Sequence, residues 1–248
     1  MLTDNELLRY SRQILLDGWD IDAQVRLKYS RVLLVGMGGL GCPVASVLVR
    51  AGVGYVHLLD FDVIDDSNLQ RQTLFSAQDV GKSKAQTAQS VLQAQNTLIT
   101  VAYDDIKITA DNAVDIIERI KPDLVIDGTD NFAVRDILNQ TCQSLGVPLL
   151  SNSAIAQTGQ LALFTRETGC YHCVFGDEGD QTANCATSGV LASTVAVIGS
   201  LSAQVALDFL GCGNNPIAGE LVLWQGQTLS LRKLKFTKNP NCRICKVD

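Results

Sequence analysis

A glycine-rich turn between a short apolar run and a helical pattern is the first stretch of this 248-residue sequence with the residues for chemistry. Residues 31–35 form the apolar, β-branched run, and apolar helical spacing extends from the turn to residue 51. The glycines of the turn are Gly36, Gly38, Gly39 and Gly41. Glycines permit sharp turns and expose backbone N–H groups, and the start of a helix attracts phosphate. The turn predicts a nucleotide site, with a ligand-free tight turn as the alternative.

An acidic residue ends the next apolar run. Residues 55–59 are followed by Asp60, nineteen positions after Gly41, where a dinucleotide-binding fold places a carboxylate on a ribose hydroxyl. A nicotinamide or flavin cofactor would be the default ligand of this pattern. The polar residues that follow argue against that default, because a triphosphate needs a row of cations and a dinucleotide does not. These residues are Asp62, Ser67, Asn68, Gln70, Arg71 and Lys84.

Asp130 and Asn131 follow another buried run, residues 124–127. Ligands of open α/β sheets bind beyond the carboxyl ends of the strands, so we expect Asp130 in the same crevice as Gly38 and Asp60. A carboxylate there is a natural Mg²⁺ ligand beside a triphosphate. The alternative role for Asp130 is to cap the helix predicted from residue 132.

Two C-x-x-C pairs offer four thiolates. Cys170 and Cys173 form one pair, and Cys242 and Cys245 form the other. Two such pairs complete a closed structural zinc site, with His172 as a bystander. A redox pair is the alternative, but neither pair lies at a helix start in a thioredoxin-like context.

The other cysteines have different settings. Cys42, Cys142 and Cys212 lie in or beside apolar patterns and are predicted to be small core residues. Cys185 ends a polar stretch, residues 176–189, which we expect to be an exposed and mobile loop. Its place before a helix could lower the pKa of the thiol, although an unreactive cysteine is the alternative.

The alternation of strands and helices predicts an α/β fold with a Rossmann-like, doubly wound, largely parallel sheet. Strands are predicted at 31–35, 55–59, 98–102, 124–127 and 148–150. Helices are predicted at 5–15, 22–29, 42–51, 81–95, 109–120 and 132–145. Beyond residue 151, runs at 160–164, 221–224 and 229–236 predict antiparallel strands that extend the sheet, and 189–210 predicts a long apolar helix for burial or a dimer face. We expect one domain, residues 1–248.

Composition narrows the class of protein. A net charge of −6 and a pI near 4.9 leave no basic footprint for nucleic acid or an anionic membrane. The first twenty residues are rich in charge, which predicts no signal peptide, and the sequence shows no bilayer-spanning run, so we expect a cytoplasmic protein. With only two histidines, His57 and His172, the reaction should depend on electrostatics and positioning more than on a histidine base.

Taken together, the motifs resemble those of the MoeB/ThiF family, bacterial relatives of the ubiquitin-activating enzymes. They cover essentially the whole chain, in the order Arg9-Tyr-Ser-Arg12-Gln13, the glycine turn, Asp60-Phe-Asp62, Ser67-Asn-Leu-Gln-Arg71-Gln72, Lys84, Thr129-Asp130-Asn131 and the two C-x-x-C pairs. The resemblance implies a homodimer that uses Mg-ATP to adenylate the C-terminal glycine of a small ubiquitin-like sulfur carrier protein, with release of pyrophosphate.

The resemblance also implies roles for individual residues. Gly39 and Asp60 would contact the adenosine, Asn68 and Arg71 the phosphates, Lys84 the triphosphate and Asp130 the Mg²⁺, while Arg12 would reach the ATP of the partner subunit. Cys185 aligns with a cysteine that some members use covalently. The chemistry agrees with the residues, because a terminal carboxylate with a pKa of roughly 3.5 is already an ionised nucleophile and needs no base. Arginine, lysine and Mg²⁺ then absorb the charge of the triphosphate.

The identity of the carrier and a few other functions remain as alternatives. We favour the small subunit of molybdopterin synthase as the carrier, with the thiazole sulfur carrier of thiamine synthesis as the alternative. A separate protein is expected to donate the sulfur, since no rhodanese-like segment follows the last cysteine pair. More distant alternatives are a nicotinamide-dependent dehydrogenase, a non-catalytic scaffold and an enzyme that adenylates a modified transfer RNA base.

Overall fold

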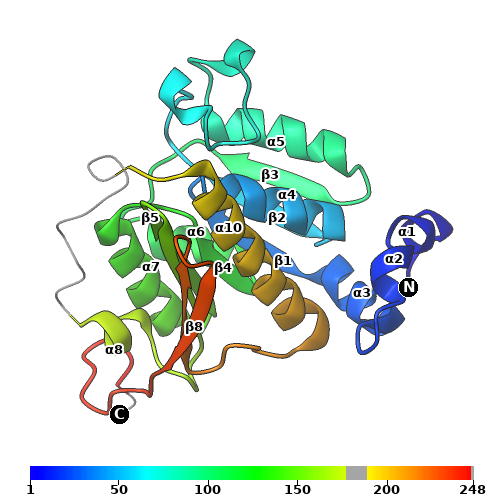
Figure 1. Cartoon of the computed structure of the whole chain (residues 1–248). Helices are drawn as coiled ribbons and strands as arrows, with labels where there is room; N and C mark the ends of the chain where they lie inside the picture. The colour runs from blue at the N-terminus through cyan, green and yellow to red at the C-terminus, as the bar shows by residue number, and fades with distance from the viewer. Residues whose placement is uncertain (177–188, 247–248) are drawn as a thin grey trace.

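The computed structural model describes residues 1–176 and 189–246, and its centre is a mixed sheet of eight strands (Figure 1). The strand order is β3-β2-β1-β4-β5-β6-β7-β8. The parallel strands are β1 (Arg31–Val35), β2 (Tyr55–Leu59), β3 (Thr100–Asp104), β4 (Leu124–Asp127) and β5 (Leu149–Ile155). The antiparallel strands are β6 (Thr158–Phe164), β7 (Glu220–Gln225) and β8 (Ser230–Lys235). The predicted fold, a parallel sheet with an antiparallel extension, is confirmed.

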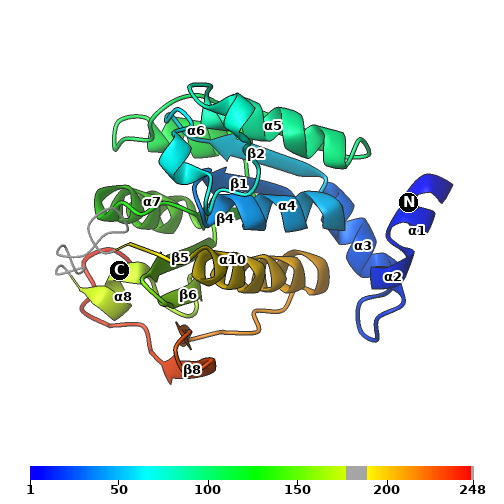
Figure 2. The same cartoon turned by 45° about the horizontal axis from the view of Figure 1, so that its top comes forward.

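Helices cover the sheet on both faces. They are α1 (Asp4–Arg9), α2 (Ser11–Ile14), α3 (Asp20–Tyr29), α4 (Gly41–Ala51), α5 (Lys84–Gln95), α6 (Ala113–Ile120), α7 (Phe132–Leu145), α8 (Tyr171–Phe175) and α10 (Ala192–Leu207). Short turns of other helix types are η1 (Asp66–Asn68), η2 (Ala77–Asp79) and η3 (Asp208–Cys212). The two views separate the layers, with α4 and α10 on one side of the sheet and α7 on the other (Figure 2).

Burial explains why the central strands read as continuous apolar runs. Val32, Leu33 and Leu34 of β1 are fully buried, because successive side chains point into opposite cores. One core contains Val32 and Leu34 with residues of α4, α5 and α10, and the other contains Leu33 with residues of α6 and α7. The sheet therefore has helices packed against both faces at the strands that carry the predicted site.

Helix α10 is the long apolar helix predicted at 189–210, and its burial is confirmed. Together with η3 it is long and apolar enough to cross a membrane, judged by length and composition alone. Half of this apolar stretch is buried inside the protein. Val195, Ile198 and Ala203 lie in the core beside α4 and β6. At Gly199 an added Cβ would overlap Pro43 of α4, so the two helices approach closely there. These contacts are those of a core helix.

The structure corrects some sequence expectations. Strand β3 begins two residues later than predicted, and β5 continues to Ile155 because it pairs along its length with β6. Cys42 and Cys142 are buried as expected, but Cys212 is exposed, since η3 brings it to the surface beside the Gly18 carbonyl. Most of the predicted loop at 176–189, with Cys185, lies outside the described residues.

The N-terminal helices lie at one end of the molecule (Figure 1). The Gln13 side chain of α2 donates to the carbonyl of Ala51, the last residue of α4, at 2.7 Å. Leu8 and Leu15 are 78% and 75% exposed on this arm, which leaves large apolar side chains uncovered within the described chain.

Candidate active site

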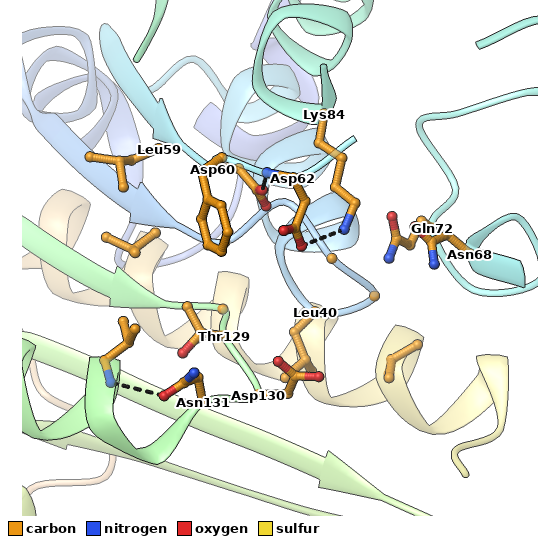
Figure 3. Close-up of a pocket in the computed structure, with 18 of the residues that line it drawn as sticks. Leu40, Leu59, Asp60, Asp62, Asn68, Gln72, Lys84, Thr129, Asp130 and Asn131 are labelled. Carbon is orange, nitrogen blue, oxygen red and sulfur yellow. Dashed lines mark hydrogen bonds and ion pairs between the residues drawn. The ribbon is translucent and has the colours of Figure 1, made fainter. Parts of the chain in front are cut away.

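A cavity of about 310 Å³ opens at the carboxyl ends of β1, β2 and β4. The order of the strands changes direction between β1 and β4, and open α/β sheets bind ligands at such a switch point. The cavity is lined by the glycine turn, by the residues after β2 and by the loop after β4 (Figure 3). We call it the crevice cavity.

The glycines of the turn divide into two roles. Gly36 has φ of +91°, and an added Cβ would meet the Gly128 backbone at 3.0 Å. At Gly41 a Cβ would overlap the Gly36 carbonyl, so these two glycines let the turn pack against the loop after β4. Gly38 and Gly39 line the crevice cavity itself. Leu40 precedes α4, whose N-terminus therefore faces the cavity.

Asp60 is held at the inner wall of the cavity. Its carboxylate accepts hydrogen bonds from the backbone N–H groups of Met37 at 2.6 Å and Asp62 at 2.8 Å. Burial raises the pKa of Asp60, although these N–H groups favour its charged form. The side chain thus joins the end of β2 to the glycine turn, where a ribose hydroxyl would lie if a nucleotide followed the usual path.

Cations and amides also line the cavity. Lys84, the first residue of α5, is 3.0 Å from a carboxylate oxygen of Asp62. Arg71 donates to the Ser67 carbonyl at 3.0 Å, and Asn68 lines the cavity beside it. Ser67 and Gln70 are exposed and do not line the cavity, because they lie on the outer side of this turn. Gln72, which is 3% exposed, lies there instead.

The loop after β4 brings Asp130 and Asn131 to the cavity. The Asn131 side chain caps α7, since its oxygen accepts from the backbone N–H groups of Ala133 at 2.9 Å and Val134 at 3.2 Å. Asn131 thus fills the capping role that the sequence left open for Asp130. The Asp130 carboxylate is exposed and has no hydrogen-bond partner among residues 1–176 and 189–246.

An apolar end of the cavity was missed by the sequence analysis. Phe61, Ile108 and Val134 line it, together with Lys107, whose ammonium lies 5.4 Å from the centre of the Phe61 ring. Ile108 is buried in the core and fixes the loop after β3. No sequence pattern marks a single loop lysine as a site residue, because only the strand order brings that loop to the end of β2.

A second hollow of about 480 Å³ lies beside the crevice cavity, across β5, β6 and β7. The two share Leu40, Thr129, Asp130 and Ala154 in their walls. Away from these residues the second hollow has aromatic and apolar walls, from Phe132, Tyr171, Phe175, Leu223 and Trp224. We call it the sheet groove. It adjoins the cavity at the Asp130 loop.

The four predicted zinc ligands come together at the C-terminal end of the described chain. The sulfur atoms of Cys170, Cys173, Cys242 and Cys245 all lie within 4.8 Å of one another. The Cys170 sulfur lies 3.8 Å from that of Cys173 and 3.6 Å from that of Cys242, and the sulfur atoms of Cys173 and Cys245 are 3.3 Å apart. These separations are close to the edge of about 3.8 Å for a tetrahedron with Zn–S bonds of about 2.3 Å. The Asn239 backbone N–H also donates to the Cys173 sulfur at 3.4 Å. The donor set fits a tetrahedral metal ion.

Arg12 is not near the crevice cavity of its own chain. It is exposed on α2, beside Gln13, which contacts the C-terminal end of α4. The N-terminal end of α4 faces the cavity, and a helix of 11 residues is about 16 Å long. Cys185 lies outside the described residues, so the structure does not place it.

Residues 10–244, nearly the whole chain, match the model of the ThiF family. The chain belongs to the ThiF family. The resemblance inferred from the motifs is confirmed.

Two relatives of this ThiF-family chain align with it over nearly their whole length. The molybdopterin-synthase adenylyltransferase of Escherichia coli (strain K12) is 43% identical, over 98% of this chain and 98% of the relative. The protein of the same name from Salmonella typhimurium is 42% identical, again over 98% of both. An adenylyltransferase and sulfurtransferase MOCS3 of Culex quinquefasciatus is 39% identical over 98% of this chain, which spans 56% of that protein.

Solved structures share the fold of this ThiF-family chain. The crystal structure of E. coli MccB with ATP has a TM-score of 0.83 and 24% identity, and the likeness covers 96% of this chain and 73% of MccB. MccB with succinimide has a TM-score of 0.84 at the same identity, over 98% of this chain and 74% of MccB. At this identity the likeness establishes the fold alone.

Proposed function

We propose that the protein is an adenylyltransferase that joins AMP from Mg-ATP to the C-terminal glycine of a small ubiquitin-like sulfur carrier, the small subunit of molybdopterin synthase. The full-length relatives named molybdopterin-synthase adenylyltransferase support this carrier. The observation that carries the proposal is that the crevice cavity and the sheet groove adjoin at Asp130, which lines both. One chamber suits a nucleotide, the other suits an extended peptide, and they meet where phosphate and carboxylate must react.

The lining of the crevice cavity suggests the orientation of ATP. The base belongs at the apolar end near Phe61 and Ile108, and the ribose belongs at Asp60. The triphosphate then extends over the backbone of the glycine turn toward the cations Arg71 and Lys84. Asp130, with its carboxylate free of other described partners, would hold Mg²⁺ beside the phosphates.

The sheet groove would receive the extended C-terminus of the carrier. Its aromatic walls suit apolar side chains, whereas the shared wall of Leu40, Thr129 and Ala154 leads to the phosphates. A carrier tail that ends in glycine would bring its terminal carboxylate to this wall without a side chain that the wall has to accommodate. Because the residues that line the two hollows lie on strands, turns and helix ends, the site is suited to positioning the two reactants.

The proposed reaction is one displacement at phosphorus. A carboxylate oxygen of the carrier forms a bond to the α-phosphorus of ATP, and the bond from that phosphorus to the bridging oxygen breaks. Pyrophosphate leaves with the electron pair, and the product is a carrier acyl-adenylate. No proton moves, so no side chain has to act as a base, and the cations serve to absorb negative charge as it shifts to the leaving group.

We infer that the active assembly is a homodimer. Arg12 lies about a helix length from the cavity of its own chain, and the exposed leucines of its arm offer apolar area for a second copy. An exchange of arms in a two-fold dimer would bring the Arg12 guanidinium to the phosphates of the partner subunit. Each active site would then need two chains.

The remaining parts of the proposal concern metal, sulfur and location. Zn²⁺ is the ion we propose for the cysteine cluster, where four thiolates leave no open position and the metal would have a structural role.

Sulfur would come from a separate donor protein. Cys185 would be dispensable for forming the acyl-adenylate, and any role for it would lie in later sulfur transfer. The chain would act as one domain, residues 1–248, in the cytoplasm, where thiols such as Cys42 and Cys142 stay reduced.

ATP–pyrophosphate exchange tests the proposal. Purified protein is mixed with Mg-ATP, labelled pyrophosphate and one carrier at a time. We expect exchange with the molybdopterin synthase small subunit and none without a carrier or with a carrier lacking its last glycine. Exchange with the thiazole sulfur carrier alone would reassign the pathway while keeping the chemistry. No exchange with either carrier would contradict the proposal.

A further inference from the structure

A buried ion pair lies beside the sheet groove, whose wall includes Arg135. The Arg135 Nε atom of α7 donates to a carboxylate oxygen of Asp127, the last residue of β4, at 2.7 Å. The two side chains are 3% and 0% exposed. Burial opposes the charge of Arg135, but the neighbouring Asp127 carboxylate raises the pKa of the guanidinium. Because desolvation offsets much of the attraction in such a pair, stability alone is a weak reason for its presence.

The Arg135–Asp127 pair forms hydrogen bonds with Thr129, the residue that precedes Asp130. The Arg135 Nη2 atom donates to the Thr129 carbonyl at 3.0 Å and to the Asn152 carbonyl of β5 at 3.2 Å. The other oxygen of Asp127 accepts from the Thr129 backbone N–H at 3.0 Å and from its hydroxyl at 2.7 Å. Thr129 is thus held through its N–H, its carbonyl and its side chain at once.

Asp130 itself is fixed only through its neighbours. On one side is Thr129, and on the other is Asn131, whose side chain is occupied in capping α7. Within the described residues the Asp130 carboxylate forms no hydrogen bond, so its position depends on the backbone that Thr129 and Asn131 hold. Asp130 and Thr129 face the cavity from the side opposite Asp62 and Lys84 (Figure 3).

We propose that Arg135 is a positioning residue that holds the loop of Thr129 and Asp130 so that the Asp130 carboxylate meets the metal ion of the bound nucleotide. The proposal rests on the proposed function of the cavity. A planar fork is required, because one guanidinium spans Asp127, Thr129 and β5 together, whereas a lysine ammonium carries the same charge on a compact group that cannot span all three. Arg135→Lys would therefore keep the positive charge beside Asp127 but lose the contacts that hold the loop, which separates the two effects by experiment.

The test compares Arg135→Lys with wild type in metal binding. Mn²⁺ serves as the probe in the presence of a non-hydrolysable ATP analogue, and electron paramagnetic resonance reports the free Mn²⁺. We expect the Kd for Mn²⁺ to rise about 10-fold or more, as it does when residues that orient metal ligands are changed. Binding of the analogue in the presence of a chelator should stay within about twofold, because the base, ribose and cation contacts are untouched.

Two further variants keep the test decisive. Arg119→Lys changes an exposed arginine of α6 that pairs with Asp104 of β3, and this variant should bind Mn²⁺ as wild type does. Thr129→Val removes only the hydroxyl that donates to Asp127 and should raise the Kd for Mn²⁺ about fivefold, the value of one ordinary hydrogen bond. If Arg135→Lys does not fold, Thr129→Val carries the test.

The possible results distinguish the role of Arg135 from the proposed function of the cavity. Wild-type Mn²⁺ affinity in folded Arg135→Lys and in Thr129→Val, even with a lowered Tm, would overturn the positioning role and leave a purely structural ion pair. A wild-type protein that binds the analogue but no Mn²⁺ would overturn the role of Asp130. A wild-type protein that binds no nucleotide would instead overturn the proposed function of the cavity, and the role of Arg135 with it.

Discussion

The ammonium group of Lys84 lies 3.0 Å from a carboxylate oxygen of Asp62 at the wall of the crevice cavity. The lysine side chain is 9% exposed and the aspartate side chain is 50% exposed, so a largely desolvated cation is paired with an acid at the rim. A triphosphate that enters the cavity meets a charge that water screens poorly. Electrostatic attraction is stronger in such a setting than at an open surface.

Lys84→Met should therefore lower the rate of ATP–pyrophosphate exchange on the order of 10²-fold, the usual loss when one charge-stabilising group is removed from an active site. Arg71→Ala should lose a similar amount. Lys82→Met is the matched control, because Lys82 is exposed, pairs with Asp79 and lies outside the cavity lining. Equal rates for Lys84→Met and Lys82→Met would remove Lys84 from the site.

The cysteine cluster should be a stability element. Purified protein is expected to hold about one zinc per chain, because two C-x-x-C pairs complete one tetrahedral site. Cys242→Ser should lower the Tm while nucleotide binding persists at temperatures below the new transition. Cys212→Ser, which changes an exposed cysteine outside the cluster, should leave the Tm unchanged. A metal-free wild-type protein with the same Tm as the zinc-loaded protein would contradict the structural role.

His57 should make stability depend on pH. It is 3% exposed, its Nδ1 lies 3.0 Å from the Tyr55 hydroxyl, and its Nε2 lies 3.1 Å from an Asp104 oxygen without a well-aligned hydrogen bond. Burial lowers the pKa of His57 below 6.5, against the pull of Asp104, while Arg31 and Arg119 add to the lowering. The unfolded chain then binds a proton below about pH 6.5 that the folded chain does not.

The stability due to neutral His57 is thus present above pH 6.5 and is lost as the pH falls through 6.5 toward the folded-state pKa. The loss is at most about 1.4 kcal/mol per pH unit for one proton. Urea unfolding at pH 7.5 and pH 5.5 should show a larger drop in the free energy of unfolding for wild type than for His57→Gln. Equal drops would mean that His57 takes up its proton in both states alike.

Each active site should need two chains, with Arg12 supplied by the partner. Arg12→Ala and Asp130→Ala chains should each be inactive alone. When they are refolded together, half of the dimers should be mixed, and each mixed dimer holds one intact site, so about a quarter of wild-type activity should return. A mixture that stays inactive although mixed dimers are shown to form would mean that Arg12 acts within its own chain or not at all.

Local sequence patterns predicted the central strands, which are buried on both faces. The bounds of β1, β2 and β4 match the apolar runs, because these strands are covered on both faces. Strand β5 was predicted to end at residue 150, yet it continues through Ser151, Asn152 and Ser153. Those polar residues look like a loop in sequence, and the pairing with β6 that extends the strand is not local.

The candidate site was predictable where a motif is local and was not where it depends on distant contacts. Asp60 and Asp130 follow buried strands, and the sheet brings such residues together. Arg135 lies in the predicted helix at 132–145, and no local pattern marks it as buried. Its partner is the buried carboxylate of Asp127, the last residue of the preceding strand β4. Lys107 and Phe61 likewise meet only because β3 lies next to β2.

Mass spectrometry of the carrier after incubation with Mg-ATP tests the central claim most directly. With wild-type protein, the carrier should gain one AMP on its C-terminal glycine carboxylate, pyrophosphate should appear in step, and Asp130→Asn should reduce the yield on the order of 10²-fold while the protein stays folded. Release of ADP or of inorganic phosphate in place of pyrophosphate would contradict the account. So would AMP attached at any site other than the terminal carboxylate.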